Sequence, residues 1–359
     1  MKKKILLISG SNPRRTPFIE FYENLLNNNG IAYDLLYWNR DAADSIDGDR
    51  ANYIVYDKPL YIYSNPLKKL YCSYKFYRFA KAIIKEGGYA KIVSFTILTS
   101  LFFQQLLSNK YKENYIFDIR DHSPLLNNKL LRHIFSKLVA NSFATVISSE
   151  GFKKWLPQNK SYVISHNIDR GLLSHDYKIN QSKDRLNILT IGFFVRFDPN
   201  GILIKSLKNI KNVNLSFVGY GPCYSQYEVF CRENAIQNVD FRGRYTKSEE
   251  LSFYDNCDMV NILLTHTLNS DTCMSNRFYN AVVCRKPMIV NGGCYQAELV
   301  DKYKLGIVIS NYENVGQQIL DYYKNLDWSE YLDGCRKYLS DIESDYNSFE
   351  NTVLSLVNK

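Results

Sequence analysis

The sequence lacks the cysteine and histidine patterns of metal-binding and disulfide-bonded proteins. Its eight cysteines are scattered, no two of them form a Cys-x-x-Cys pair, and its five histidines show no metal-ligand spacing. Several cysteines lie in apolar segments, where the side chain behaves as a small hydrophobic group. We therefore expect reduced thiols, no metal site and a cytoplasmic location.

The sequence also has no apolar run of about 18 residues, the length that a membrane-spanning helix needs. The start of the chain superficially resembles a signal peptide, but its apolar part, Ile5–Gly10, is too short and is better interpreted as a buried first strand. A hydrophobic content of 45% with 23% charged residues is typical of a globular protein, and 359 residues suit two domains.

Acidic residues are scarce in the first half of the chain. Residues 1–170 hold 25 lysines and arginines against 14 aspartates and glutamates, whereas the remainder holds 20 against 22. This imbalance predicts that the first half meets an anionic surface or substrate. Nucleic acid is not expected, because no recognised binding motif accompanies the charge.

The segment Pro66–Glu86 concentrates this charge, with six basic residues, one acidic residue and five aromatic residues at helical spacing. Such a basic amphipathic helix can lie on an anionic lipid surface. Alternatively, its apolar stripe packs on a sheet while the lysines are simply solvated.

The chain begins with a strand, a helix over Phe18–Asn29 and a second strand over Ile31–Trp38, and the pattern restarts with the strand Leu186–Gly192. Such units predict doubly wound parallel sheets of the α/β class. In the loop after the first strand, Arg14 and Arg15 either bind an acceptor or form a basic solvated turn.

A later segment, Ser275–Gly293, reads as a helix with a polar start, a short apolar strand and a glycine pair. The amino end of a helix has unpaired N–H groups and a positive dipole, which suit a phosphate, and Arg277 would add charge there. The alternative is an ordinary helix and strand of an α/β domain.

This segment resembles the donor-site helix of retaining GT-B glycosyltransferases of the large nucleotide-sugar family 4. Ser275 stands for the usual proline, Arg277 for the lysine and Asn280 for the second glutamate. The strand Leu215–Tyr220 and the Gly-x-Gly-Pro turn that follows also resemble this family. The resemblance implies that the donor is bound by Gly192, Arg196, Lys205, Gly219, Gly221, Arg244, Asn276, Arg277 and Asn280.

Some positions depart from the family pattern. Asn200 occupies the place of a phosphate-loop lysine, for which Lys205 could compensate. The usual pair of glutamates is replaced by Thr272 and Asn280, which would weaken donor binding by about 1–2 kcal/mol. Glu298 could supply an alternative carboxylate.

In the first half, Asp118–Pro124 resembles the Asp-x-Arg-Asp segment of the family. The resemblance implies catalytic positions for Arg120, Asp121 and His122, since an ionised carboxylate and an imidazole can orient sugar hydroxyls. Alternatively, Asp121 or Ser123 simply caps the next helix.

The resemblance implies a GT-B fold, with two Rossmann-like domains of parallel sheets facing across a cleft. We expect an acceptor-binding domain of residues 1–170 and a nucleotide-sugar-binding domain of residues 171–340. Residues 341–359 would form a C-terminal helix that crosses back to the first domain. The polar run 170–185 would be the interdomain linker.

The implied activity is retaining transfer of a sugar from a nucleotide diphosphate-sugar to a hydroxyl, without metal or other cofactor. The expected acceptor is a glycan or lipid-linked intermediate, which the protein would bind in the cytoplasm or at the inner face of the cell membrane. Two alternatives stay open: a catalytically degenerate scaffold subunit and a sugar-nucleotide epimerase.

Overall fold

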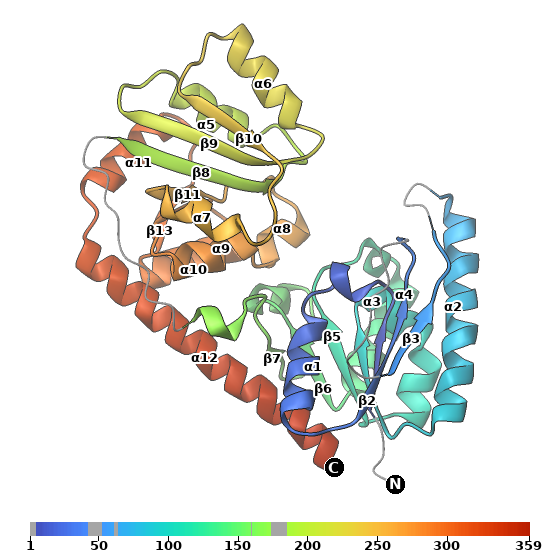
Figure 1. Ribbon diagram of the computed structural model, residues 1–359. Coiled ribbons are helices and arrows are strands. Elements are labelled where there is room, and N and C mark those ends of the chain that lie inside the picture. Colours follow the sequence, from blue (N-terminus) through green and yellow to red (C-terminus); the bar gives the residue numbers. More distant parts are fainter. Residues whose placement is uncertain (1–4, 42–51, 61–63, 159, 174–184) are drawn as a thin grey trace. The chain divides into compact units, whose positions relative to one another are not determined.

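The computed structural model describes residues 5–41, 52–60, 64–158, 160–173 and 185–359. The chain divides into two compact units (Figure 1). Unit 1 comprises Met1–His166 and Asp345–Lys359, and unit 2 comprises Asn167–Ser344. These limits differ by a few residues from the boundaries expected after residues 170 and 340. Residues 174–184 of the expected linker lie outside the described part of the chain.

Unit 1 is built on a parallel sheet with the strand order β3-β2-β1-β4-β5-β6-β7. Its strands are almost continuously apolar, as expected for a parallel sheet covered on both faces, and β1, β4 and β5 are buried along their whole length. The strands are β1 (Ile5–Ser9), β2 (Tyr33–Trp38), β3 (Asn52–Tyr56), β4 (Lys91–Phe95), β5 (Tyr115–Ile119), β6 (Ala144–Ile147) and β7 (Val163–Ile164).

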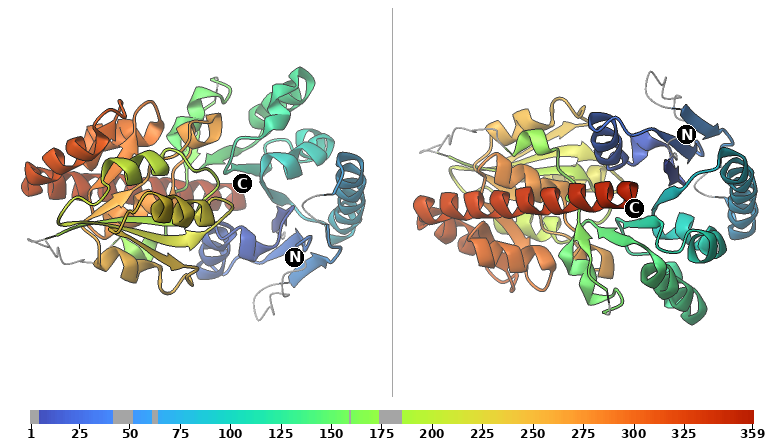
Figure 2. Two further views of the ribbon diagram at one scale, coloured as in Figure 1. Left: turned by 90° about the horizontal axis from the view of Figure 1, so that it is seen from above. Right: turned by 90° about the horizontal axis from the view of Figure 1, so that it is seen from below.

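Helices cover both faces of this sheet (Figures 1 and 2). On one face, the Tyr22 ring of α1 meets Phe349 of α12 edge-on at 4.9 Å between ring centroids. On the other face, Phe76 of α2 stacks on Trp38 and Phe135 of α4 packs on Phe117. The helices are α1 (Ile19–Asn28), α2 (Pro66–Gly87), α3 (Ile97–Phe102), α4 (Lys129–Asn141) and the end of α12 (Trp328–Asn358), with the short turns η1 (Pro13–Arg15), η2 (Leu106–Lys110), η3 (Pro124–Asn127) and η4 (Glu150–Lys154).

Unit 2 is built on a second parallel sheet with the order β10-β9-β8-β11-β12-β13. Strands β8 and β9 pair in register from Leu186 and Val213 to Phe193 and Tyr220. The strands are β8 (Leu186–Phe193), β9 (Val213–Tyr220), β10 (Val239–Gly243), β11 (Met259–Asn261), β12 (Met288–Asn291) and β13 (Gly306–Ile309).

Helices α5, α6 and α11 bury one face of this sheet in a single apolar cluster, and α10 packs on β12 and β13. The helices are α5 (Asn200–Ser206), α6 (Tyr224–Glu233), α7 (Glu250–Asp255), α8 (Leu268–Thr272), α9 (Asn276–Val283), α10 (Tyr295–Tyr303) and α11 (Val315–Lys324), with the turn η5 (Arg170–Leu172) and the first part of α12. None of the helices in the described ranges is long and apolar enough to cross a membrane.

Candidate functional site

A cavity of about 240 Å³ lies in unit 2, at the carboxyl ends of β8 and β11. Ligands of open α/β sheets bind at this edge, outside the ends of the strands. Two residues that the sequence assigned to donor binding, Arg196 and Arg277, line the cavity. The full lining comprises Phe193, Phe194, Val195, Arg196, Asp198, Pro199, Asn200, Leu263, Leu264, Thr265, Thr267, Ser270 and Arg277.

Arg277 lies in the first turn of α9, where the Ser275 side chain caps the helix by accepting from the Arg277 N–H at 3.2 Å. Burial lowers the pKa of the guanidinium, and nearby tyrosines and Cys273 oppose this shift. An arginine nevertheless stays protonated in proteins. Among the described residues, no carboxylate lies within 4.0 Å of its nitrogens. A partly buried cation without a counter-ion beside a helix amino end favours a bound anion.

The predicted glycines Gly192, Gly219 and Gly221 have φ values of 127°, 141° and 145°, which favour glycine. A Cβ atom on Gly219 would lie 1.9 Å from the carbonyl oxygen of Gly192, and one on Gly221 would lie 2.3 Å from that of Phe194. Glycine is thus required at these positions because two segments of the chain itself approach each other closely. These glycines shape the backbone that carries the Phe193 and Phe194 wall of the cavity.

The other predicted donor residues do not line the cavity; they are the three glycines, Lys205, Arg244, Asn276 and Asn280. Lys205 is exposed on α5, so it does not compensate there for the missing lysine, and Asn276 is exposed at the start of α9. Arg244 lies with its guanidinium carbon 3.9 Å from the ring centroid of Tyr220. Asn200 is buried, and its Oδ1 accepts from Nδ2 of Asn261 at 2.8 Å.

Asn280 has a carboxylate neighbour that the sequence did not reveal. Its Nδ2 donates to Oε1 of Glu250 at 3.0 Å, and both side chains are buried. Since an ionised carboxylate only accepts hydrogen bonds, the amide nitrogen must face Glu250, and Oδ1 of Asn280 points elsewhere. Glu298, the expected substitute carboxylate, is exposed on α10. Glu250 lies thirty residues before Asn280, and no local pattern links the two.

Thr272, at the other glutamate position, is buried, and its hydroxyl donates to the carbonyl oxygen of Leu268 at 2.6 Å. It therefore contributes to the fold of the α8 turn.

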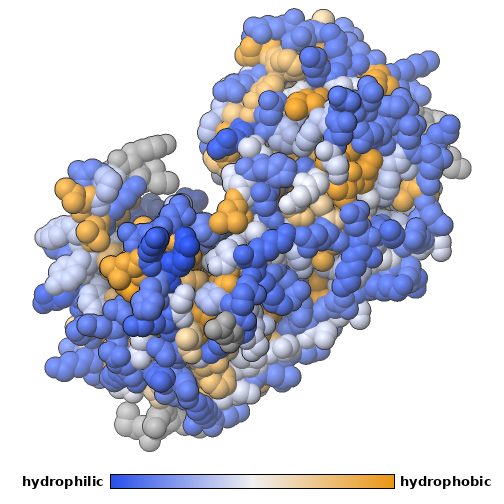
Figure 3. Space-filling view, turned by 180° about the vertical axis from the view of Figure 1, so that it is seen from behind, coloured by the Kyte–Doolittle hydropathy of each residue, from blue (hydrophilic) through white to orange (hydrophobic). Residues whose placement is uncertain are grey.

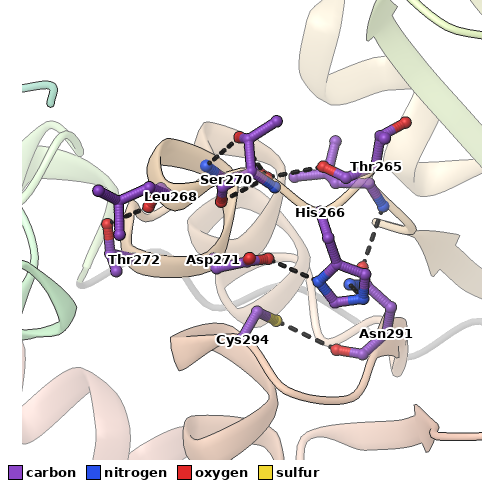
Figure 4. Close-up of polar contacts among 10 residues, drawn as sticks. Thr265, His266, Leu268, Ser270, Asp271, Thr272, Asn291 and Cys294 are labelled. Atoms are coloured by element: carbon purple, nitrogen blue, oxygen red, sulfur yellow. Dashed lines mark hydrogen bonds and ion pairs between the residues drawn. The ribbon is translucent and has the colours of Figure 1, made fainter. Parts of the chain in front are cut away.

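A second unpredicted group is His266, which lies in the sequence between Thr265 and Thr267, two residues that line the cavity. Figure 4 shows its ring between Asp271 and Asn291. Its Nδ1 lies 2.7 Å from Oδ1 of Asp271, and its Nε2 lies 3.1 Å from Nδ2 of Asn291. Oδ1 of Asn291 accepts from the Leu264 N–H at 3.0 Å, so the amide nitrogen faces the imidazole. The neutral ring therefore donates from Nδ1 and accepts at Nε2. This arrangement fixes the loop that carries the Thr265, Thr267 and Ser270 wall.

In unit 1, the predicted catalytic residue Arg120 lies in a buried ion pair. Its Nε and Nη2 donate to Asp118 at 2.5 and 2.7 Å, and its Nη1 donates to the Ser165 carbonyl oxygen at 2.9 Å. The Tyr22 hydroxyl also donates to Asp118, at 2.7 Å. Arg120 is 5% exposed, so this geometry favours a structural role in holding β5 to the segment after β7.

The next two residues have different surroundings. Asp121 is exposed, and the half-buried ring of His122 meets Trp155 edge-on at 5.1 Å between centroids. Burial, and secondarily Arg132, lowers the pKa of His122, so its imidazole is neutral at neutral pH. Ser123 caps the short turn η3 by accepting from the Leu125 N–H, whereas the helix α4 is capped by Asn128.

Arg14 and Arg15 lie exposed on η1, which follows β1 and is capped by Asn12. Within the described ranges, no cluster of three or more histidine, cysteine or acidic side chains could hold a metal ion.

No protein-family profile and no curated protein sequence matches this chain. Solved structures do match it along nearly its whole length. Sucrose-phosphate synthase from Thermosynechococcus elongatus superposes with a TM-score of 0.74 at 15% identity, covering 99% of each chain. HepE from Anabaena, solved with UDP, gives 0.70 at 12% identity over 98% of this chain and 100% of its own.

WaaG, a glycosyltransferase involved in lipopolysaccharide biosynthesis, gives a TM-score of 0.62 at 12% identity, covering 97% of this chain and 98% of its own. At such identities the likeness concerns the fold. The chain therefore has the fold of the GT-B glycosyltransferases, with two Rossmann-like α/β domains.

Proposed function

We propose that this protein is a retaining glycosyltransferase that moves a sugar, of the hexose class, from a nucleotide diphosphate-sugar to a hydroxyl acceptor. The observation that carries the proposal is the cavity in unit 2, where Arg277, without a carboxylate partner among the described residues, meets the amino end of α9. The two together would neutralise the charge of a diphosphate. Stabilisation of a departing diphosphate is the main electrostatic task of such a reaction.

The reaction would depend on residues that position the donor and the acceptor more than on a strong base. Arg196 and Arg277, which line the cavity, would hold the diphosphate. The departing phosphate would take the acceptor proton. Asp121 and the neutral imidazole of His122 would orient sugar hydroxyls, since the neutral ring both donates and accepts.

Nucleotide binding tests this proposal. A ligand present at 100 times its dissociation constant should stabilise the protein by about 2.7 kcal/mol and raise the unfolding temperature by a few degrees. The measurement is thermal unfolding with UDP, GDP, ADP, CDP and dTDP. Uridine nucleotides come first because HepE was solved with UDP and UDP-glucose. The proposal fails if none of the five nucleotides raises the unfolding temperature.

We further propose that the acceptor is lipid-linked and that α2 lies on an anionic membrane surface. Besides its buried face, this helix presents a second apolar face to solvent. Leu67 is 78% exposed, and Leu70, Tyr71 and Tyr74 are also exposed. Figure 3 shows hydrophobic atoms among hydrophilic ones on the part of unit 1 that carries α2. The basic residues of α2 would contact lipid head groups.

Vesicle binding tests the membrane proposal. Each lysine or arginine near an anionic surface contributes about 1 kcal/mol, so a quadruple change of Lys68, Lys69, Lys75 and Arg78 to Gln should nearly abolish binding. The measurement is cosedimentation with vesicles of phosphatidylglycerol and phosphatidylcholine. A matched control changes four exposed basic residues of unit 2: Lys208, Lys211, Arg232 and Arg336. Equal loss in both variants, or none in either, would contradict the proposal.

The scaffold alternative gains support from Thr272 and Asn280, which replace the glutamates of the resembled family. It predicts no nucleotide binding. The epimerase alternative predicts conversion of the nucleotide-sugar without any acceptor.

A further inference from the structure

His266 lies between two groups that favour different protonation states of its ring (Figure 4). On one side, Nδ1 lies 2.7 Å from Oδ1 of Asp271, a residue of α8. A carboxylate beside an imidazole favours the protonated, charged ring. On the other side, Nε2 lies 3.1 Å from Nδ2 of Asn291, at the end of β12. Since an amide nitrogen only donates hydrogen bonds, this second contact requires that Nε2 carries no proton.

The amide of Asn291 cannot turn to accept a proton from the ring without losing another hydrogen bond. Its Oδ1 accepts from the backbone N–H of Leu264 at 3.0 Å, and a backbone N–H can only donate. With the amide reversed, Nδ2 of Asn291 would face the Leu264 N–H, and both groups would be donors. Asn291 is 3% exposed, so the lost bond would not be replaced readily by water, and its loss costs free energy.

The same amide holds one wall of the cavity in unit 2. The segment 264–271 runs from the end of β11 into α8, and three of its residues line the cavity: Thr265, Thr267 and Ser270. Hydrogen bonds from Leu264 and His266 tie this segment to Asn291. The position of the wall therefore depends on a hydrogen-bond pattern that the neutral imidazole completes.

Other titratable side chains around this segment keep their charge state near neutral pH. Burial raises the pKa of the Cys294 thiol, at the start of α10, and of the Tyr312 hydroxyl, after β13. Both groups therefore stay neutral between about pH 5 and 8, the range in which histidine ordinarily titrates. The charged groups around the segment are Asp198, Asp271 and Arg277. His266 is thus the member of this cluster that changes charge in that range.

We propose that His266 is a positioning residue whose protonation releases this wall of the cavity and weakens binding of the nucleotide-sugar. The imidazolium donates from both nitrogens, so it keeps its pairing with Asp271 and is repelled by the amide nitrogen of Asn291. Because the side chain is 54% exposed, the ring has room to move into solvent, and the segment then loses a link to β12. The inference rests on the proposed function, and it adds regulation by pH to that site.

Histidine NMR of the full chain without nucleotide tests the hydrogen-bond geometry. At about pH 8, the ring of His266 should carry its proton on Nδ1 and none on Nε2, and His266→Gln identifies its signals among the five histidines. In Asn291→Asp, a carboxylate can accept from both the Leu264 N–H and the Nε2–H. The ring should then stay protonated to a pH about one unit higher. A proton on Nε2 in the unaltered chain, or identical titration of both chains, would overturn the inference.

Titration calorimetry with UDP-glucose as the probe tests the effect on binding. A nucleotide-sugar is preferable to a free diphosphate, because a terminal phosphate itself takes up a proton near pH 6. From about pH 7.5 to about pH 5.5, the affinity of the unaltered chain should fall about tenfold, the equivalent of one hydrogen bond. The affinity of His266→Gln should change less than about twofold, because this chain has no ring to protonate. His133→Gln, a change at an exposed histidine of unit 1, is the matched control and should retain the fall.

An equal fall of affinity in all three chains would overturn the inference, as would an affinity of the unaltered chain that does not depend on pH. Failure of the proposed function has a different signature. If UDP-glucose does not bind at any pH, the proposed function fails for uridine donors, and the NMR titration, which needs no nucleotide, then supports or overturns the role of His266 by itself.

Discussion

Two arginines that the sequence placed in the site have opposite surroundings. Arg120, after β5 of unit 1, meets Asp118 at 2.5 Å and is almost inaccessible. Arg277, at the start of α9 in unit 2, lines a cavity and has no carboxylate within ion-pair distance among the described residues. The first cation is neutralised by the fold itself, whereas the second favours an external anion. Whether an arginine has a carboxylate partner within the fold therefore distinguishes a structural role from a binding role more clearly than a sequence motif does.

Removing one member of the buried pair should give the largest effect. Arg120→Met leaves the Asp118 carboxylate buried without a cation, which should cost about 3–5 kcal/mol of unfolding free energy. Changing Asp118→Leu in the same chain should recover much of that loss, because no charge is then left unpaired. Urea unfolding measures both. A fully stable Arg120→Met variant without transferase activity would instead support the catalytic role that the sequence predicted.

The unpaired arginine should show the reverse pattern. Arg277→Ala should weaken binding of the nucleotide found in the thermal screen by about 1.5–3 kcal/mol, or roughly 10- to 150-fold, with little loss of stability. Arg277→Lys should retain part of the affinity, because the charge remains but the forked geometry is lost. Titration calorimetry measures the affinity, with Arg336→Ala, an exposed change elsewhere in unit 2, as control. Equal affinity of all variants would remove Arg277 from the site.

The smallest effect concerns His122, which lies two residues after Arg120 and is half-buried. Since burial lowers its pKa in the folded state, the unfolded chain binds the proton more readily. The stabilisation from the neutral ring is therefore present above the unfolded pKa of about 6.5 and is lost as the pH falls through and below it. His122→Gln should reduce the slope of unfolding free energy against pH just below pH 6.5. Unchanged slopes would contradict a depressed pKa.

The parallel sheets could be predicted because their signals are local. The apolar strands expected over residues 5–10 and 186–192 correspond to β1 and β8, and the boundaries of α1 lie within one residue of those expected. Arg196 and Arg277, which the family resemblance assigned to donor binding, both line the cavity.

The rest depended on contacts that sequence spacing does not encode. Asp118 and Arg120 are two residues apart and therefore point to the same side of the strand. Their burial could not be predicted, because it depends on Tyr22 and Phe349, which cover that side. Glu250 meets Asn280 across two helices, and His266 meets Asn291 across two strand ends. Such pairs depend on how elements far apart in the chain pack together.

The shared helix α12 has a consequence for synthesis on the ribosome. Phe349, Val353 and Leu356 belong to the apolar core of unit 1, although unit 1 apart from Asp345–Lys359 ends at His166. At a translation rate of about 5–20 residues per second, these three residues are synthesised roughly ten to forty seconds after the rest of unit 1. The unit that is translated first thus becomes complete last, and a nascent or truncated chain lacking α12 should expose this apolar face to chaperones.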